Sequence, residues 1–543
     1  MHTCLRVTQL CAAVAPNPSH SPIPRAHTQD VAVLGQLGLN SYRFSIAWPR
    51  IFPTGDSSGA PNAKGVQFYH NLIDELIAAG ITPIVTMYHW DLPQGLIDAN
   101  YYKVIPSCDP AFKQGWFECS HDAEGTIVPT GSKANTVIQF GKYAEFLLKE
   151  FGSKVKVWAT FNEAWTFTYL GSGYGKAPSV QPYMDNDIWP YVAGHNVILA
   201  HLAAAKAFRK LQQDGTLSQE HLLGITNNQD WREPYSHAPQ DIAAAQAALE
   251  GQLAWYCDPI YGVGGTHDYP DSMKRLRPYM PAFSADEKAD LAKYKPDFFG
   301  LNHYGTGFVK FDAATKASKV VQDGIVQGES VWLYGAGWGF RKLLNWVSKR
   351  YGPSYPIYCT EAGWSVNAKN SLEAKYDPGR IMYYYSYLSE AHAAMTEDGV
   401  DLRGFAAWSF ADNFEWERGY SERFGVMYND FNFGTDPNAP DDKTPIYQAN
   451  SGKIDGVCGV ECLENGIPDP VTAINQTRHA KGALLWLQWL WRGSEIPSPD
   501  RWLAASIGGD VCYGTGTYTV STQTFNCALK SDVPGPPQYP PHA

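Results

Sequence analysis

Two glutamates stand out because each lies near the end of a short apolar segment that predicts a buried strand. Glu163 ends the segment Val155–Glu163, and Glu361 lies within the segment Pro356–Trp364. Two carboxyl groups that face each other across a pocket can cleave a glycosidic bond, one transferring a proton and the other acting as nucleophile or base. Either glutamate alone would more often be a structural ion-pair partner, so the hypothesis depends on both together.

Other polar and aromatic residues follow predicted strands in the same way. They are Arg43, His89, Trp90, Asn162, Asn302, Tyr304 and Trp408, and Glu415 and Trp416 follow shortly after Trp408. An indole face can lie against the apolar face of a sugar ring, and a carboxylate can accept hydrogen bonds from two adjacent hydroxyls. The alternative for Trp408–Trp416 is a buried aromatic cluster with one surface glutamate. A lone histidine after a strand, such as His89, is usually structural.

The elements that would position these residues alternate as strand and amphipathic helix. The predicted strands are Ser41–Ile51, Ile81–Trp90, Val155–Glu163, Leu222–Asn228, Asp297–Tyr304, Pro356–Trp364 and Leu402–Asp412. The predicted helices between and after them cover residues 68–77, closed by Gly80, and 140–151, 193–211 and 479–491. Such alternation predicts an α/β fold of parallel strands. Polar residues at the end of every strand favour a (β/α)8 TIM barrel over an open sheet, because barrel strand ends converge on one face.

The eighth strand has no clear counterpart in the sequence. Residues 30–38 are predicted as a helix, and residues 1–28 as an irregular segment rich in proline. Residues 5–15 end in Ala-x-Ala, as a signal-peptide cleavage site would, but Arg6, Thr8 and Gln9 interrupt the apolar core. We therefore expect a first strand that is missing or replaced, as in a mis-started gene model. The barrel domain is predicted to span 29–495, with loop insertions at 98–132 and 433–475 and a C-terminal extension at 496–543.

Composition excludes several other classes of protein. The 543 residues carry a formal net charge of −11 and are 44% hydrophobic. This is globular composition, and the acidic balance without a basic stripe disfavours a nucleic-acid partner. The longest apolar stretch, residues 483–491, is about half a membrane span. We therefore expect a small-molecule partner and no membrane-spanning segment.

The ten cysteines predict neither a metal centre nor a disulfide scaffold. Cys458 and Cys462 have CxxxC spacing with no matching histidine or cysteine pair, so no metal is expected there. The pairs Cys108–Cys119, Cys458–Cys462 and Cys512–Cys527 cluster in loop-like stretches. Together with the sequon Asn475–Thr477, that clustering favours secretion or an endomembrane lumen over the cytoplasm.

Six segments, in order along the chain, resemble glycoside hydrolase family 1, the β-glucosidase family. They are Ser41–Ile51, His89–Pro93, Thr160–Glu163, Gly300–Tyr304, Thr360–Gly363 and Trp408–Gly425. The resemblance covers roughly residues 28–492 and implies a retaining β-glycosidase that needs no cofactor. It implies that Glu163 is the acid/base and Glu361 the nucleophile.

The resemblance also implies roles for the other strand-end residues. His89, Trp90, Asn162, Glu415 and Trp416 would contact the sugar, and Trp408 would be the stacking platform. Arg43, Asn302 and Tyr304 match the family residues that surround the nucleophile.

The sequence departs from the family at its first strand, with its sugar-binding glutamine, and at Ala362, where the family usually has asparagine. A barrel open between two strands would leave backbone groups unpaired and predicts a poorly stable chain. That gap allows an alternative, a catalytically weak or inactive glycoside-binding relative. Because both glutamates are present, the sequence favours the active enzyme.

Overall fold

The structure is a computed structural model of the 543-residue chain. It describes residues 7–12, 24–97, 134–174, 186–277, 280–368, 377–419, 421–429, 478–493, 516–519 and 524–527, a few residues between 115 and 129, and residues 374, 496 and 499. The predicted loop insertions at 98–132 and 433–475, the C-terminal extension, the sequon and the three cysteine pairs lie wholly or mostly outside the described residues. Two described cysteines, Cys257 and Cys359, are buried.

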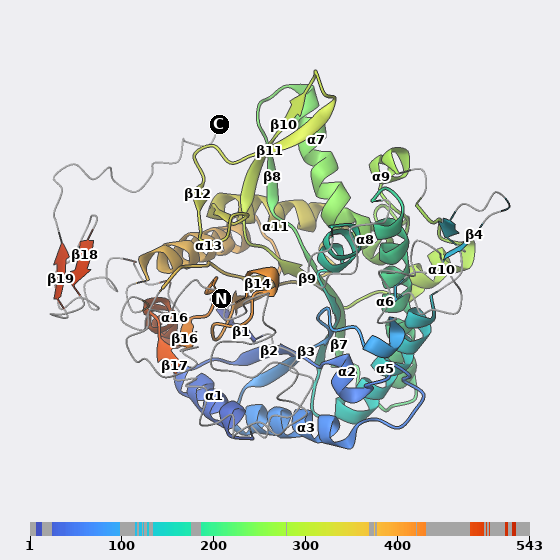
Figure 1. Ribbon diagram of the computed structural model, residues 1–543, viewed down its shortest axis with the longest axis horizontal. Coiled ribbons are helices and arrows are strands. Elements are labelled where there is room, and N and C mark those ends of the chain that lie inside the picture. Colours follow the sequence, from blue (N-terminus) through green and yellow to red (C-terminus); the bar gives the residue numbers. More distant parts are fainter. Residues whose placement is uncertain are drawn as a thin grey trace, which may run out of the picture.

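Parallel strands form a closed barrel at the centre of the molecule, in the order β1-β15-β14-β9-β7-β6-β3-β2 (Figure 1). Their bounds are β1 Val7–Ala12, β2 Ser41–Ser45, β3 Thr82–Tyr88, β6 Val157–Asn162, β7 Leu222–Asn228, β9 Phe298–Asn302, β14 Ile357–Ala362 and β15 Leu402–Trp408. The strands β2 and β9 are buried along their whole length, as expected when helices cover a parallel barrel. The predicted TIM barrel is confirmed; β7 has the predicted bounds, and the other predicted strands are shorter than the predicted segments.

Helices surround the barrel in Figure 1. The main ones are α1 Pro24–Leu37, α3 Ala63–Ala78, α5 Asn135–Phe151, α6 Trp189–Gln213, α11 Gly337–Tyr351, α13 Pro378–Thr396 and α16 Gly482–Gly493. In α3 the residues Tyr69, Leu72, Ile73 and Leu76 are buried, which is the apolar stripe expected of a helix that covers a core. The helix ends just before Gly80, whose φ of 74° is the left-handed conformation that ends many helices.

The first strand of the barrel is replaced, not missing. Val7–Ala12 forms β1, which pairs in parallel with β15 on one side and with β2 on the other. The prediction of an irregular segment over 1–28 was therefore wrong for these residues and for the start of α1. The reason is local: the strand is only six residues long and includes Thr8 and Gln9, so it has no apolar run or alternation to reveal it. Its backbone pairing closes the barrel, and the expected gap with two unpaired edges is absent from the described strands.

Shorter helices and strands lie outside the barrel strands and main helices. The short helices are α2 Trp48–Ile51, η1 Gln94–Leu96, η3 Thr166–Gly173, α7 Pro239–Leu249, η4 Glu250–Ala254, α8 Trp255–Tyr261, α9 Asp271–Leu276, α10 Ala285–Lys293 and η5 Trp416–Arg418. The short strands are β4 Cys119–His121, β5 Ile127–Pro129, β8 Trp231–Pro234, β10 Thr306–Asp312, β11 Ala317–Val321, β12 Val326–Gln327, β13 Tyr334–Gly335, β16 Met427–Asn429, β17 Arg478–Ala480, β18 Gly516–Thr519 and β19 Thr524–Cys527.

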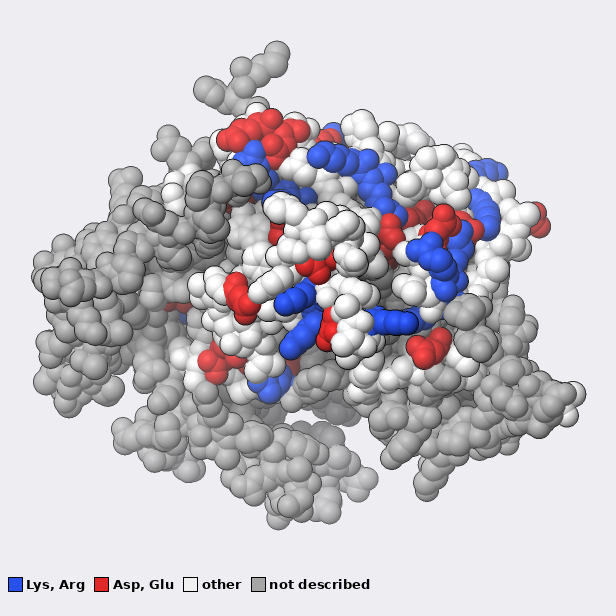
Figure 2. Space-filling view, turned by 90° about the horizontal axis from the view of Figure 1, so that it is seen from above, with Lys and Arg blue, Asp and Glu red and all other residues white. Residues whose placement is uncertain are grey.

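Charges of both signs are interspersed on the face shown in Figure 2. The described residues form several exposed or half-exposed ion pairs, such as Arg341 with Asp398 at 2.7 Å and Lys342 with Glu233 at 2.8 Å. Exposed pairs of this kind contribute little to stability. Because charges of both signs are interspersed on the face in Figure 2, that face carries no strong single-sign field. Among the described residues, no helix is long and apolar enough to cross a membrane.

Candidate active site

The barrel brings the predicted site residues to one end. Apart from Arg43, in the middle of β2, each lies at or beyond the carboxyl end of a strand, the face on which barrel enzymes build their sites. Arg43 is on β2, His89 and Trp90 follow β3, Asn162 ends β6 and Glu163 follows it, Asn302 ends β9 and Tyr304 follows it, Glu361 is on β14, Trp408 ends β15, and Glu415 and Trp416 lie beyond it. Hydrogen bonds and ring contacts link these residues into one connected cluster.

Glu361 is buried and surrounded by groups that favour its charged form. Its side chain pairs with the Arg43 guanidinium, with Nη1 and Oε1 2.7 Å apart, and both side chains are almost fully buried. The Tyr304 hydroxyl donates to the other carboxylate oxygen at 2.8 Å. Burial and the charge of Glu361 raise the pKa of Tyr304 well above its usual value, so this hydroxyl stays a donor.

Glu163 is equally buried, at 8% exposed, but its surroundings differ. Asn302 donates to its Oε1 at 2.8 Å, and the Thr166 hydroxyl donates to its Oε2 at 2.9 Å. Burial, followed by repulsion from Glu361, raises the pKa of Glu163 to about 8, although these hydrogen bonds and the more distant Arg43 oppose the rise. A carboxyl group with such a pKa keeps its proton at neutral pH and can donate it.

An amide network joins the two glutamates. Asn302 Nδ2 donates to Glu163 Oε1 at 2.8 Å and to the side-chain oxygen Oδ1 of Asn162 at 3.1 Å. Asn162 also accepts a hydrogen bond from Arg43 at 2.7 Å, and the Thr360 hydroxyl donates to Asn302 Oδ1 at 2.7 Å. Because each group in this network has a buried partner, the geometry of the two carboxyl groups is fixed before any ligand enters.

Aromatic residues form the rim. The His89 and Trp408 rings stack with centroids 6.0 Å apart, and the Trp90 and Trp416 rings lie 4.4 Å apart. The Trp408 indole donates to Glu415 at 3.3 Å. Burial is the main cause that raises the pKa of Glu415 to about 8. The predicted cluster of tryptophans and a glutamate therefore exists, but it borders the carboxyl pair and Glu415 is only partly buried, unlike a closed aromatic core.

Two rim residues have their polar groups held by the protein itself. The Trp90 indole donates to the backbone oxygen of Asn162 at 2.8 Å, so it braces the strand end. Asn162 Nδ2 donates to His89 Nε2 at 3.2 Å, which leaves Nδ1 of the neutral ring as the N–H donor. Burial, followed by the charge of Arg43, lowers the pKa of His89 to about 3, so the ring is neutral.

Backbone strain is concentrated at this end of the barrel. Among the described residues, four other than glycine have a positive φ, and three of them are Trp90, Glu163 and Trp416, at 78°, 51° and 47°. The left-handed conformation is costly for such residues and is retained mainly where function requires it. Glu163 needs it because the chain turns sharply from β6 into the helical segment, with the Thr166 N–H donating back to the Glu163 carbonyl at 2.9 Å.

The family model "Glycosyl hydrolase family 1" matches residues 24–105 and 130–450. The chain is 39% identical over 446 residues to β-glucosidase 1B of Phanerodontia chrysosporium, covering 78% of this chain and 74% of that relative. The chain belongs to glycosyl hydrolase family 1.

Relatives in this family share both sequence and fold with the chain. Rice β-glucosidase 6 is 37% identical over 439 residues, covering 74% of this chain and 76% of that relative. A solved rice β-glucosidase mutant, in a covalent complex with glucose, superimposes with a TM-score of 0.67 at 32% identity and covers 86% of this chain and 87% of its own. A Humicola insolens β-glucosidase in complex with glucose gives 0.64 at 36% identity, with 75% and 82% covered. The chain is thus a glycoside hydrolase of the β-glucosidase family.

Some residues of this family 1 site were missed by the sequence analysis. Thr166 contacts Glu163, and Asn228 donates to the Thr166 hydroxyl at 3.0 Å. The signal was available for Thr166, because a side chain three residues beyond a strand-end glutamate can turn back onto it. Asn228 also carried a signal, because it is the polar last residue of the predicted strand Leu222–Asn228, which the structure confirms as β7.

A buried charge cluster also supports the Trp408–Trp416 segment from behind. Asp412 accepts from Arg423 at 2.8 Å and from Lys481 at 2.6 Å. Its Oδ1 also accepts from the backbone N–H of Gly425 at 3.0 Å. These bonds join the segment to the chain beyond it, so the rim that carries Glu415 and Trp416 rests on a fixed base.

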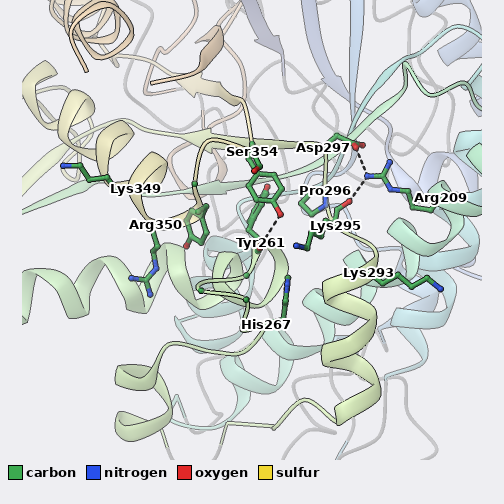
Figure 3. A pocket seen from close by; sticks show the side chains of 16 residues that line it. Arg209, Tyr261, His267, Lys293, Lys295, Pro296, Asp297, Lys349, Arg350 and Ser354 are labelled. Atoms are coloured by element: carbon green, nitrogen blue, oxygen red, sulfur yellow. Dashed lines mark hydrogen bonds and ion pairs between the residues drawn. The ribbon is translucent and has the colours of Figure 1, made fainter. Parts of the chain in front are cut away.

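A hollow of about 630 Å³ lies elsewhere, at the opposite end of β9 and β14 (Figure 3). Its basic lining residues are Arg209, His267, Lys293, Lys295, Lys349 and Arg350. Arg209 is paired with Asp297 and Arg350 with Asp258, each at 2.6 Å. The helices α8, α10 and α11 end here, and basic residues complement the negative ends of helices. These cations are explained by local structure, and the described residues hold no cluster of metal-binding side chains.

Proposed function

We propose that the chain is a retaining β-glucosidase that hydrolyses terminal β-D-glucosyl residues by double displacement, with Glu163 as acid/base and Glu361 as nucleophile. One observation carries the proposal: two carboxyl groups share one network but have opposite surroundings. Glu361 is paired with Arg43 at 2.7 Å, whereas burial and like charge raise the pKa of Glu163 to about 8. Environments that separate a charged from a protonated carboxyl group assign nucleophile and acid.

In the first step, an oxygen of the charged Glu361 attacks the anomeric carbon. The bond from that carbon to the leaving oxygen breaks as Glu163 gives this oxygen its proton. The products are an ester between the sugar and Glu361 and a released alcohol, with Glu163 now ionised. Arg43 and Tyr304 hold the attacking carboxylate in place, at 2.7 and 2.8 Å.

In the second step, Glu163 takes a proton from water, and the resulting hydroxide oxygen bonds to the anomeric carbon. The ester bond breaks and Glu361 leaves as a carboxylate. The change of role follows from electrostatics. Repulsion from Glu361 is the second-largest cause of the raised pKa of Glu163, and an ester carries no charge, so the pKa falls once the intermediate forms.

Sugar recognition would come from the rim. Trp408 offers a flat apolar face, and Glu415 can accept from two adjacent hydroxyls. The neutral His89 has an N–H to donate, and the Asn162 amide has a second proton beside the one that it donates to His89. A hydrogen bond from Asn162 to the 2-hydroxyl would tighten as positive charge develops on the ring.

The solved relatives support the covalent route. The rice β-glucosidase mutant was solved in a covalent complex with glucose, which is the kind of species that the first step produces. The alternative of a weak or inactive relative rested on a missing first strand, and β1 now occupies that position.

The stereochemistry of the first product tests the proposal. Proton NMR during hydrolysis of an aryl β-D-glucoside by the full chain should detect β-glucose first, with α-glucose appearing only by mutarotation. The proposal also requires the two carboxyl groups to lie ~5–5.5 Å apart. Initial release of α-glucose, or no release of glucose at all, would overturn it.

Neutral sugars should be preferred over phosphorylated ones. A phosphate on the 6-hydroxyl would lie near Glu415, and the described part of the Trp408–Gly425 segment places Arg418 against Glu422 and Arg423 against Asp412. Both cations are therefore already paired with carboxylates. Comparing kcat/KM for a β-glucoside and its 6-phosphate should give a large preference for the plain glucoside, and the reverse preference would refute this.

A further inference from the structure

We infer that Thr166, oriented by Asn228, is a positioning residue that holds Glu163 ready to accept a proton in the second step of the reaction. The inference deepens the proposed function and rests on the acid/base role of Glu163. Thr166 reaches the reaction only through Glu163, because its hydroxyl is committed to that carboxyl group.

The direction of the hydrogen bonds is fixed by chemistry. Asn228 Nδ2 lies 3.0 Å from the Thr166 hydroxyl oxygen and can only donate to it. The hydroxyl proton is therefore free to point at Glu163 Oε2, 2.9 Å away. The chain Asn228–Thr166–Glu163 consists of two donors in series, so it favours a negative charge on Glu163.

Among the described residues, the Asn228 side chain makes one hydrogen bond, the one to the Thr166 hydroxyl. Asn228 is the last residue of β7, the strand next to β6, which leads into Glu163. In the described part of the chain, its Oδ1 is buried and has no hydrogen-bond partner. Leaving a buried amide oxygen unpaired is costly, so this side chain is held in an orientation that is poor for itself and correct for Thr166.

The backbone turn after β6 brings the Thr166 hydroxyl to the Glu163 side chain. Glu163 adopts a left-handed conformation, with φ 51°, and the chain turns directly into the helical segment that begins at Thr166. The Thr166 N–H donates to the Glu163 backbone carbonyl at 2.9 Å while its hydroxyl donates to the Glu163 side chain. The same turn therefore strains Glu163 and supplies its hydrogen-bond donor.

Several groups set the balance of charge on Glu163. Glu361 on β14 repels its charge, whereas Arg43 on β2 and Asn302 on β9 favour it, as does Thr166. Tyr304 and Glu415 also interact electrostatically with it from beyond β9 and β15. Burial and the charge of Glu361 outweigh these groups and raise the pKa of Glu163 to about 8. The Thr166 hydrogen bond thus lowers the pKa of Glu163, which helps this residue to act as a base in the second step.

Replacing Thr166 tests this with a change of nearly constant volume. In Thr166→Val, the Glu163 carboxylate loses one donor, so its proton is held more tightly. The basic limb of the kcat/KM profile, expected near pH 8 in the parent enzyme, should move up by about one pH unit. With an activated aryl glucoside, for which the second step limits kcat, kcat should fall on the acidic side because the base stays protonated.

Three matched variants keep the test interpretable. Thr166→Ser retains the hydroxyl and should restore the parent profile. Asn228→Leu should move the basic limb in the same direction as Thr166→Val, but less. In a Glu163→Gln background, adding Thr166→Val should leave the pH profile unchanged, because the group that Thr166 acts on is gone.

Three outcomes distinguish failure of the inference from failure of the proposed function. If Thr166→Val leaves the basic limb unmoved while its melting temperature equals that of the parent, the inference is overturned and the proposed function stands. The inference is equally overturned if Thr166→Ser shifts the limb as far as Thr166→Val does. If Glu163→Gln instead hydrolyses substrates with poor leaving groups at the parent rate, the proposed function itself fails.

Discussion

Glu361 and Glu163 are a natural comparison, because one residue type occupies two neighbouring positions in one network and is treated in opposite ways. Both are nearly inaccessible to solvent, at 3% and 8% exposed. Glu361 has a guanidinium at 2.7 Å, whereas the hydrogen-bond donors to Glu163 are a neutral amide and a neutral hydroxyl. Burial is thus common to both glutamates, and what differs is the charge of the group that contacts each one.

The neighbours of the two residues explain why the arginine reaches only one of them. Arg43 lies in the middle of β2, three strands from β14 around the closed barrel and two from β6. Its Nη1 reaches Glu361 directly, but its Nη2 is taken by the Asn162 oxygen at 2.7 Å. Arg43 is thus connected to Glu163 only through two amides, because Asn302 Nδ2 donates both to Asn162 Oδ1 and to Glu163.

The largest expected effect is the loss of the nucleophile. Glu361→Gln cannot form the ester, so kcat/KM should fall by about 10⁵-fold or more for every β-glucoside, whatever its leaving group. Initial rates with a nitrophenyl glucoside and with cellobiose measure this. Glu397→Gln, a variant of an exposed carboxylate outside the site, serves as the control, and comparable losses in both variants would contradict the assignment.

A smaller and substrate-dependent effect is expected at Glu163. Glu163→Gln removes the proton donor, so kcat/KM should fall by about 10²–10⁴-fold for alkyl glucosides, whose leaving groups need protonation. For a dinitrophenyl glucoside, which leaves without help, the first step should be nearly unaffected. Plotting log kcat/KM against leaving-group pKa checks this, and equal losses for both substrates would erase the distinction between the two glutamates.

Breaking the ion pair should come next in size. Arg43→Met leaves Glu361 buried without its cation, which typically destabilises the fold by about 3–5 kcal/mol. It also removes the group that orients the nucleophile, so kcat/KM should fall by roughly 10²–10³-fold. Arg43→Lys keeps the charge and should recover part of that loss. Thermal unfolding of each variant shows whether it still folds. Parent-like activity in folded Arg43→Met would mean that the arginine does not prepare the nucleophile.

The smallest effect concerns stability and has opposite signs at the two sites. The pKa of Glu163 rises from 4.5 in the unfolded chain to about 8 in the folded one. Between these values the folded state binds more protons, so its stability falls as pH rises. Glu163→Gln removes that penalty, and its melting temperature should exceed the parent's by about 2 °C at pH 8 and by nearly nothing at pH 4.5.

Glu361→Gln provides the matched contrast, because it breaks the pair with Arg43 and should melt below the parent. Differential scanning calorimetry across pH 4.5–8 records both variants. A melting temperature of Glu163→Gln that drops relative to the parent as pH rises would reverse the sign and show that the folded chain does not favour the protonated carboxyl group.

Most of the barrel could be predicted because its signals are local. Apolar runs, amphipathic stripes and a glycine such as Gly80 each act within a few residues, so the seven barrel strands after β1 were found, with the helices α1, α3, α5, α6 and α16. The helices α11 and α13 were not predicted. The strand β1 was not, because its register is set by partners far away in sequence, at Ser41 and Ala406, and not by its own pattern. Tertiary pairing overrode a weak local preference.

The site divides in the same way. Residues at strand ends were found because the topology of a barrel fixes where those ends meet. The contacts that tune them were not, since Asn228 and the Asp412 cluster act through side chains on other elements. Sequence also gives no measure of burial, and burial is the largest cause of the raised pKa of Glu163, ahead of repulsion from Glu361.

The pairing of β1 with β15 has a consequence for folding during synthesis, because the two strands emerge from the ribosome at very different times. The strand β1 ends at Ala12, and its second partner begins only at Leu402. At roughly 5–20 residues per second, the intervening chain takes about 20–80 s to emerge. For all of that time one edge of the nascent sheet has no complementary strand, which is the state in which an emerging chain is most exposed to association with its neighbours. Pausing translation before β15 should therefore leave a chain that needs a chaperone.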